Sequence, residues 1–154
     1  MLGALRPVTG GRLCIVLGCG GDRDRAKRPL MGAASSRLAD VAILTSDNPR
    51  SEDPLAILAV MLAGVLTVPE QERARVIIEP DRAAAIGLAV AMAGKGDVVV
   101  VAGTGHERGQ YVRDSVIPFD DREVAAAAIR HHPGRAAAAE MPPADAPLPW
   151  EVQP

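Results

Sequence analysis

Four apolar runs alternate along this chain with four segments in which apolar residues recur at helical spacing. The runs are rich in Val, Ile and Leu and are bounded by glycine or polar residues, which is typical of buried strands. They cover residues 12–17, 41–45, 76–78 and 98–102. The segments predicted as helices cover about residues 28–38, 53–64, 81–93 and 120–131. Asp53 and Asp81 are the expected N-caps of the second and third helix.

This alternation predicts an α/β fold, a Rossmann-like open and mostly parallel sheet with helices on both faces. Right-handed crossovers would bring the loops that follow the strands to one edge of the sheet. Residues 110–119 predict a small β-hairpin that turns at Asp114 and Ser115. Residues 1–11 hold no complete element, although Leu2 and Leu5 fit the last turn of a helix whose beginning is absent.

The predicted domain spans residues 1–132. From Pro133 onward the sequence turns to Ala and Pro with almost no aliphatic pattern. This composition predicts a disordered tail over residues 133–154.

Composition and charge narrow the class of protein. The 154 residues suffice for one domain, whose core must be built from aliphatic residues because aromatics make up only 2%. A formal net charge of −2 gives no electrostatic footprint for nucleic acid or an anionic membrane. The start of the chain lacks the apolar stretch of a signal peptide, and no run approaches the roughly 20 residues of a membrane span. We therefore expect a cytoplasmic protein with no nucleic-acid or membrane partner.

The two cysteines form neither a disulfide framework nor a zinc-binding pattern. Cys14 falls inside a predicted strand. We expect it to act as a small hydrophobic residue of the core.

Three predicted strands end in glycine-rich or polar loops, at residues 18–24, 46–50 and 103–107. Because ligands of open parallel α/β sheets bind at the carboxyl ends of the strands, these loops should converge on one site. They supply a set of polar side chains, namely Arg23, Asn48, Arg50 and Glu107. Guanidinium, amide and carboxylate groups together complement a small ligand that carries both carboxylates and ammonium groups.

Each of these residues also has a plain structural interpretation. Residues 47–49 read Asp-Asn-Pro, which is common turn chemistry. Arg23 lies between two aspartates, and a surface pair of this kind contributes roughly 0–1 kcal/mol. Glu107 fits a solvated loop charge, and His106 fits a hydrogen-bonded structural residue as well as a general base. The residues by themselves leave both interpretations open.

Nucleotide-binding motifs are absent from these loops. Residues 18–23 have Arg23 where the third glycine of a dinucleotide fingerprint is needed for helix–strand packing. Residues 94–96 read Gly-Lys-Gly and lack the hydroxyl residue of a P-loop. We therefore predict that the chain has no ATP cradle of its own.

Five motifs follow one another in the chain. They are Gly-Cys-Gly-Gly-Asp-Arg-Asp at 18–24, Lys-Arg-Pro-Leu-Met-Gly at 27–32, Thr-Ser-Asp-Asn-Pro-Arg-Ser-Glu-Asp-Pro at 45–54, Gly-Thr-Gly-His-Glu at 103–107 and Phe-Asp-Asp-Arg-Glu at 119–123. Over about residues 2–131 the chain resembles the C-terminal domain of the Mur ligase family. The resemblance is to the branch that adds the third peptide residue to UDP-N-acetylmuramoyl-L-alanyl-D-glutamate.

The resemblance implies an ATP- and magnesium-dependent amide ligation in peptidoglycan synthesis. A carboxylate of the UDP-MurNAc-dipeptide is activated as an acyl phosphate, and the amine of meso-diaminopimelate attacks it. Carried over by position, the residues implied to bind diaminopimelate are Arg23, Asp47, Asn48, Pro49, Arg50, Gly103 and Glu107. In the family the Asp-Asn-Pro-Arg form goes with this amino acid, so Arg50 is the expected specificity residue. It suits the distal carboxylate that lysine lacks, and Glu107 suits the neighbouring ammonium group.

Two features depart from the family pattern. Thr104 stands where Gly-Lys-Gly-His-Glu usually has lysine. The 154 residues include neither the UDP-binding domain, nor the P-loop domain, nor the segment that usually opens the C-terminal domain, which implies a truncated domain lacking its first strand. We therefore expect ATP and Mg²⁺ to serve the full-length family enzyme, and we expect this chain to bind neither and to hold no catalytic or metal-ligating residue.

The leading prediction is the amino-acid-binding domain of a diaminopimelate-adding ligase, inactive by itself. One alternative is a non-catalytic module that binds diaminopimelate or docks on a partner. The other is a degenerate fragment without function.

Overall fold

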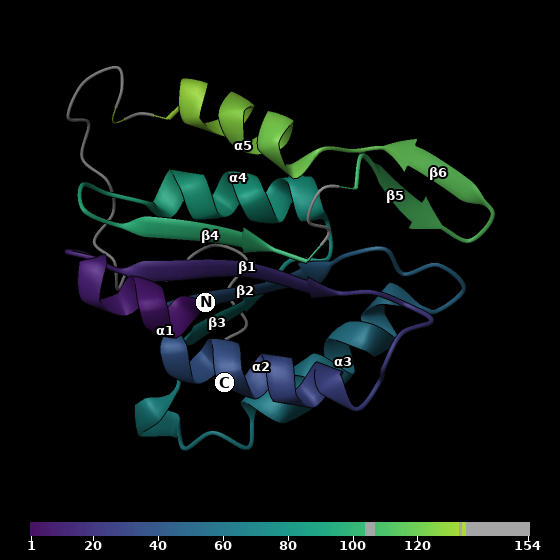
Figure 1. Ribbon diagram of the computed structural model, residues 1–154, viewed down its shortest axis with the longest axis horizontal. Coiled ribbons are helices and arrows are strands. Elements are labelled where there is room, and N and C mark those ends of the chain that lie inside the picture. Colours follow the sequence, from purple (N-terminus) through teal and green to yellow (C-terminus); the bar gives the residue numbers. More distant parts are fainter. Residues whose placement is uncertain (104–106, 133, 135–154) are drawn as a thin grey trace.

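A four-stranded parallel sheet forms the centre of the computed structural model, which describes residues 1–103, 107–132 and 134. The strands follow the order β3-β2-β1-β4 across the sheet (Figure 1). They are β1 (Leu13–Cys19), β2 (Val41–Ser46), β3 (Arg75–Ile78) and β4 (Val98–Ala102). The predicted α/β fold with a mostly parallel sheet is confirmed.

Helices cover both faces of the sheet (Figure 1). One face carries α1 (Leu2–Leu5), α2 (Lys27–Leu38) and α3 (Pro54–Val65), and the other carries α4 (Arg82–Met92) and α5 (Asp121–Arg130). Short 3-10 turns, η1 (Arg6–Val8) and η2 (Glu70–Glu72), join these elements. Asp53 and Asp81 cap α3 and α4 as predicted, because their carboxylates accept backbone N–H groups of the first helical turn.

The core has two halves, one on each side of the sheet. Successive side chains of a strand point to opposite faces. Leu13, Ile15 and Leu17 therefore pack toward α2 and α3, whereas Cys14 and Val16 pack toward α4. Cys14 is a buried residue of the core, as predicted, and burial raises the pKa of its thiol to about 12.

Strand β1 is longer than the sequence predicts. Gly18 and Cys19, which we expected in a loop, continue the parallel pairing opposite Thr45 and Ser46 of β2. Only glycine fits at position 18. A Cβ atom there would lie 2.8 Å from the Cβ atom of Asp47, the residue that follows β2. The extra pairing carries β1 up to the edge where the loops meet.

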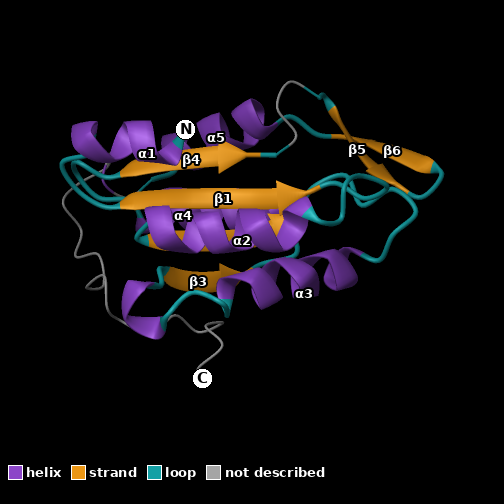
Figure 2. Cartoon of the chain, turned by 60° about the horizontal axis from the view of Figure 1, so that its bottom comes forward, coloured by secondary structure: helices purple, strands orange, loops and turns teal. Residues whose placement is uncertain are grey.

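The predicted hairpin forms from β5 (Gly109–Val112) and β6 (Ser115–Pro118), which pair antiparallel. It turns at Arg113 and Asp114, one residue earlier than predicted, because Ser115 already pairs with Val112. Figure 2 shows this hairpin beyond the carboxyl ends of the parallel strands. It lies against the loop that follows β2, where Arg50 and Val112 form an isolated parallel bridge. The hairpin thus becomes part of the edge where we expect a ligand.

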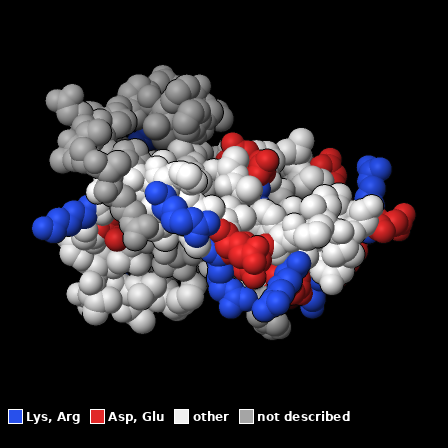
Figure 3. Space-filling model, turned by 90° about the horizontal axis from the view of Figure 1, so that it is seen from above, with Lys and Arg blue, Asp and Glu red and all other residues white. Residues whose placement is uncertain are grey.

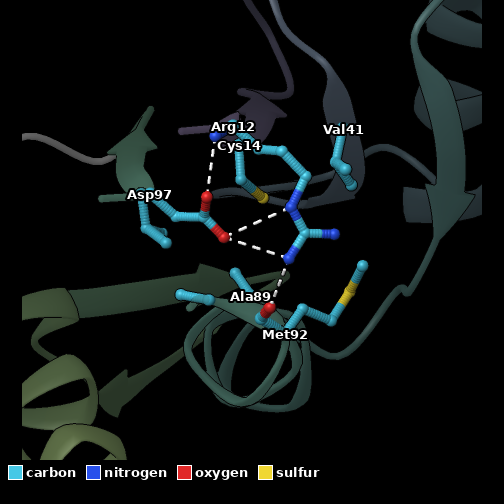
Figure 4. A pocket seen from close by; sticks show the side chains of 8 residues that line it. Arg12, Cys14, Val41, Ala89, Met92 and Asp97 are labelled. Atoms are coloured by element: carbon cyan, nitrogen blue, oxygen red, sulfur yellow. Dashed lines mark hydrogen bonds and ion pairs between the residues drawn. The ribbon is translucent and has the colours of Figure 1, made fainter. Parts of the chain in front are cut away.

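The opposite edge of the sheet is closed. Arg12 bonds Asp97 through its backbone N–H and its guanidinium, with a shortest N···O distance of 2.7 Å, and also donates to the Met92 carbonyl (Figure 4). The cavity beneath them has a volume of about 10 Å³, which is room for one water molecule at most. This cavity is therefore too small for an amino-acid ligand.

The surface carries charges of both signs. On the face seen in Figure 3, acidic and basic side chains are interspersed rather than gathered into a field of one sign. Among the described residues, no helix is both long enough and apolar enough to cross a membrane.

Candidate functional site

Three loops meet at the carboxyl edge of the sheet and enclose a cavity of about 170 Å³. Its lining residues come from the loops after β1, β2 and β4. They are Gly20, Arg23, Asp47, Asn48, Arg50, Gly103 and Glu107. Six of the seven residues that the sequence nominated therefore line one space, and the seventh, Pro49, does not line it. Their role in binding a substrate stays a prediction.

Asn48 connects two parts of this site. This residue is only 2% exposed. The Asn48 Oδ1 atom accepts a hydrogen bond of 2.9 Å from the Tyr111 backbone N–H, and Nδ2 donates to the Glu107 carboxylate. Glu107 is half-buried and bonded to Asn48, so the interpretation of Glu107 as a merely solvated loop charge is wrong.

Pro49 is buried, and its backbone contacts fix the conformation of the loop that follows β2. Its carbonyl accepts the Glu52 N–H at 2.9 Å, which closes a turn, and the Asn48 carbonyl accepts the Gly21 N–H at 2.7 Å. A Cβ atom at Gly21 would lie 1.8 Å from the Pro49 carbonyl oxygen, so only glycine allows the two loops to approach this closely. Turn chemistry and a place at the cavity thus coexist in residues 47–50.

Arg50 lines the cavity and has a left-handed backbone conformation, with φ of 54°. Two backbone bonds to the hairpin hold it there, Arg50 N–H to the Tyr111 carbonyl at 3.0 Å and Arg113 N–H to the Arg50 carbonyl at 2.7 Å. Its Cζ atom lies 5.5 Å from the centre of the Tyr111 ring. In the part of the chain that the structure describes, no carboxylate forms an ion pair with Arg50.

Acidic groups form the deeper wall of the cavity. Asp47 is 8% exposed, and burial raises the pKa of its carboxyl group, opposed by the positive charge of Arg82 and assisted by Glu107 and Asp121. Gly103 adopts φ of 133° beside it, and a Cβ atom there would lie 3.2 Å from Asp47 Oδ2. Carboxylates thus stand within one space with the guanidinium of Arg50, an arrangement that suits a ligand with charges of both signs.

Arg23 is exposed at the mouth of the cavity. The flanking aspartates bond elsewhere: Asp22 accepts from Ser51 Oγ at 2.6 Å, and Asp24 lies 3.8 Å from the Lys27 ammonium group. Thr104 and His106, on which the sequence raised further expectations, lie outside the described residues.

A buried ion pair joins the first two loops. Arg28 donates to both carboxylate oxygens of Glu52, at 2.9 and 2.8 Å, and to the Gly20 carbonyl at 3.1 Å. Glu52 also accepts the Asp22 N–H at 2.7 Å. These hydrogen bonds lower the pKa of Glu52 to about 2, and the bonds from Arg28 have the largest effect. The pair holds the loops of Arg23 and Arg50 side by side.

Acid should destabilise the chain in part through Glu52. Its folded pKa of about 2 lies below the usual 4.5, so its contribution is complete above pH 4.5 and is lost as the pH falls toward 2. The Glu52→Gln variant should therefore show a smaller fall in unfolding temperature over this interval than the wild type, measured by circular dichroism. Glu72→Gln, at an exposed position of η2, should keep the wild-type fall. Equal profiles for wild type and Glu52→Gln would contradict this role.

Comparison with known proteins gives this arrangement a context. The family described as "Mur ligase, glutamate ligase domain" matches residues 1–105. This chain belongs to the Mur ligase family. The resemblance inferred from the motifs is thereby confirmed.

Individual Mur ligases agree with the family match. The chain is 63% identical over 134 residues to the UDP-N-acetylmuramoyl-L-alanyl-D-glutamate–2,6-diaminopimelate ligase of Streptomyces avermitilis, covering 87% of this chain and 26% of the relative. The ligase of the same name from Prochlorococcus marinus is 53% identical over 129 residues, covering 84% and 24%. A solved structure of such a ligase superposes with a TM-score of 0.76 at 43% identity, covering 85% of this chain and 26% of that one. The chain thus spans about a quarter of the length of these Mur ligases.

The described residues do not fit the ATP–magnesium centre that a Mur ligase uses. The sequence holds no P-loop. Within residues 1–103, 107–132 and 134, no group of three or more His, Cys, Asp and Glu side chains is placed to hold a metal ion.

The sequence did not nominate three residues that shape the site. Gly20 lines the cavity, Tyr111 contacts Arg50, and Arg82 lies beneath Asp47. Gly20 belongs to a recognised motif and is within reach of sequence reasoning. Tyr111 is the single tyrosine of the chain and sits in a predicted hairpin, but no pattern connects it to Arg50.

Proposed function

We propose that this chain is the amino-acid-binding domain of a ligase that adds meso-diaminopimelate to UDP-MurNAc-L-Ala-D-Glu in peptidoglycan synthesis. The domain binds and orients the amino acid, and it works only together with the parts of the ligase that activate the acceptor carboxylate with ATP and Mg²⁺. One observation carries the proposal: a guanidinium without a carboxylate partner among the described residues shares a cavity with two carboxylates.

The charges of diaminopimelate match this cavity. Each end of the molecule carries one carboxylate and one ammonium group. Arg50 takes a carboxylate of one end, and Glu107, oriented by Asn48, takes the ammonium group beside it. Lysine has the ammonium group but no carboxylate at that end. It would leave Arg50 facing the cavity without its partner, which is the physical basis of discrimination.

Affinity of the chain alone should be low. Charge-assisted hydrogen bonds contribute roughly 1.5–3 kcal/mol each, whereas immobilising the ligand costs on the order of 4–15 kcal/mol. Three or four such bonds in a cavity open to solvent correspond to a Kd of about 1 mM.

We therefore expect ¹H–¹⁵N NMR titration of the 154-residue chain to give a Kd of about 1 mM for meso-diaminopimelate and weaker binding of L-lysine. The shifted resonances should include those of the loops after β1, β2 and β4. Preference for lysine, or sub-micromolar affinity for either amino acid, would contradict the proposal.

A chimeric ligase separates this function from a module that only binds. In it, residues 1–132 replace the matching part of the Streptomyces avermitilis relative. Ligation of diaminopimelate by this chimera is the expected result. A different outcome would favour the non-catalytic alternative: the isolated chain binds diaminopimelate with the expected affinity, but the folded chimera does not ligate it.

A further inference from the structure

The guanidinium of Arg50 is held in place by unusual means. A buried arginine is ordinarily fixed by a carboxylate, as Arg28 is by Glu52 and Arg82 by Asp121. Arg50 has no such partner among the described residues, and its Nε atom is buried without a hydrogen bond there. What it has is the ring of Tyr111, 5.5 Å from its Cζ atom.

An aromatic ring restrains a guanidinium without neutralising it. The face of the ring attracts the cation and limits its rotamers, yet it leaves the N–H edges open to a planar acceptor. A carboxylate at the same place would occupy those edges and would have to be displaced by the ligand. The stacking arrangement thus keeps Arg50 ordered and still available.

The backbone of the same residue reinforces this arrangement. The Tyr111 carbonyl accepts the Arg50 N–H at 3.0 Å, and the Tyr111 N–H donates to Asn48 Oδ1 at 2.9 Å. Arg50 needs such support because a residue other than glycine rarely adopts a φ of 54°. Tyr111 therefore contacts both the main chain and the side chain of the loop that carries the predicted specificity residue.

Arg50 and Glu107 stand at the boundary between two spaces, and Tyr111 lines only the larger of them. Arg50 and Glu107 line the cavity of about 170 Å³ and also a larger groove of about 450 Å³, whose other lining residues include Tyr111 and Val116. The Arg50 side chain borders both spaces, and stacking on Tyr111, a residue of the groove, restricts its rotamers.

We infer that Tyr111 is a positioning residue that sets the specificity of the amino-acid site, by stacking on Arg50 and presenting its guanidinium to a ligand carboxylate. This inference rests on the proposed function. Tyr111 is 40% exposed, so its ring contributes to the site more than to the core. Loss of the ring should weaken the binding of a ligand that has the distal carboxylate. It should not change the binding of a ligand that lacks this group.

The test uses the 154-residue chain with Tyr111→Leu, Tyr111→Gln and Tyr111→Phe, each made alone and in an Arg50→Ala background. Tyr111→Leu and Tyr111→Gln should each raise the Kd for meso-diaminopimelate about tenfold and leave that for L-lysine unchanged, and Tyr111→Phe should stay within about twofold of wild type. In the Arg50→Ala background neither Tyr111 substitution should lower the affinity for meso-diaminopimelate any further, because the ring acts through Arg50. Thermal unfolding identifies any variant that is not folded, and the remaining one is then used.

A second readout needs no ligand. The Arg50 Hδ resonances should carry a ring-current shift in wild type and Tyr111→Phe that disappears in Tyr111→Leu. Unchanged diaminopimelate affinity in a folded Tyr111→Leu chain, or equal weakening of lysine, would overturn the inference while leaving the proposed function intact if Arg50→Ala still weakens binding. Absence of diaminopimelate binding by the wild type would instead reject the proposed function, and the ring-current shift would still report whether Tyr111 orders Arg50.

Discussion

Replacing Arg50 by alanine should raise the KM for meso-diaminopimelate about 100-fold in the chimeric ligase, with a much smaller change in the KM for the nucleotide substrate. The variant removes the guanidinium of a residue that lines the cavity, and with it the one or two charge-assisted bonds that we expect it to form with the ligand carboxylate. It leaves Glu107, whose bond to Asn48 does not involve Arg50. Discrimination against lysine should therefore fall along with the affinity.

Arg37→Ala is the matched control for this variant. Arg37 is an exposed arginine of α2, outside the cavity, so its loss removes the same charge without touching the site. Steady-state kinetics with diaminopimelate and lysine should give wild-type values for it. Equal effects of the two substitutions on the KM for diaminopimelate would remove Arg50 from the specificity role.

The second large effect concerns stability. Asp121→Ala should lower the free energy of unfolding by about 3–5 kcal/mol, because it leaves a buried cation without its carboxylate. The side chain of Arg82 is 0% exposed and donates to both oxygens of Asp121 at 2.7 Å. The same guanidinium also reaches the Ala102 carbonyl at 3.2 Å, at the end of β4.

Urea unfolding followed by circular dichroism measures this effect. Arg130→Ala, at an exposed position of the same helix, should change the free energy of unfolding by no more than about 0.5 kcal/mol. Asp121→Asn keeps the shape of the side chain and removes the charge, so it should fall between Asp121→Ala and wild type. A loss of less than about 1 kcal/mol for Asp121→Ala would show that the ion pair is not what stabilises this edge of the sheet.

The Arg82–Asp121 ion pair and Arg50 lie at the same edge of the sheet, where the loops that follow the strands meet. Asp121 and Arg82 tie α5 to α4 and to the end of β4, directly beneath Asp47. Arg50 stands on the loop above. We therefore expect Asp121→Ala to weaken binding of diaminopimelate through the position of Asp47, whereas Arg50→Ala should leave the unfolding midpoint close to wild type.

The fold could be predicted from the sequence because its signals are local. Apolar runs of strand length, aspartates at helix starts and glycines at strand ends each act within a few residues. Parallel strands then place every following loop at one edge, so the neighbourhood of Arg23, Asn48 and Glu107 followed from topology. The extension of β1 through Gly18 was missed because glycine favours loops when only local preferences are considered.

The sequence by itself determined the family, the layered α/β fold and six of the residues that line the cavity, since motifs and periodicity are written in consecutive positions. Only the tertiary structure decided how those residues are held. The Asn48 side chain bonds the backbone of Tyr111, 63 positions away, and Arg82 bonds Asp121, 39 positions away. Such partners are selected by the packing of separate elements, because hydrogen bonds and ring contacts depend on distances that no local pattern encodes.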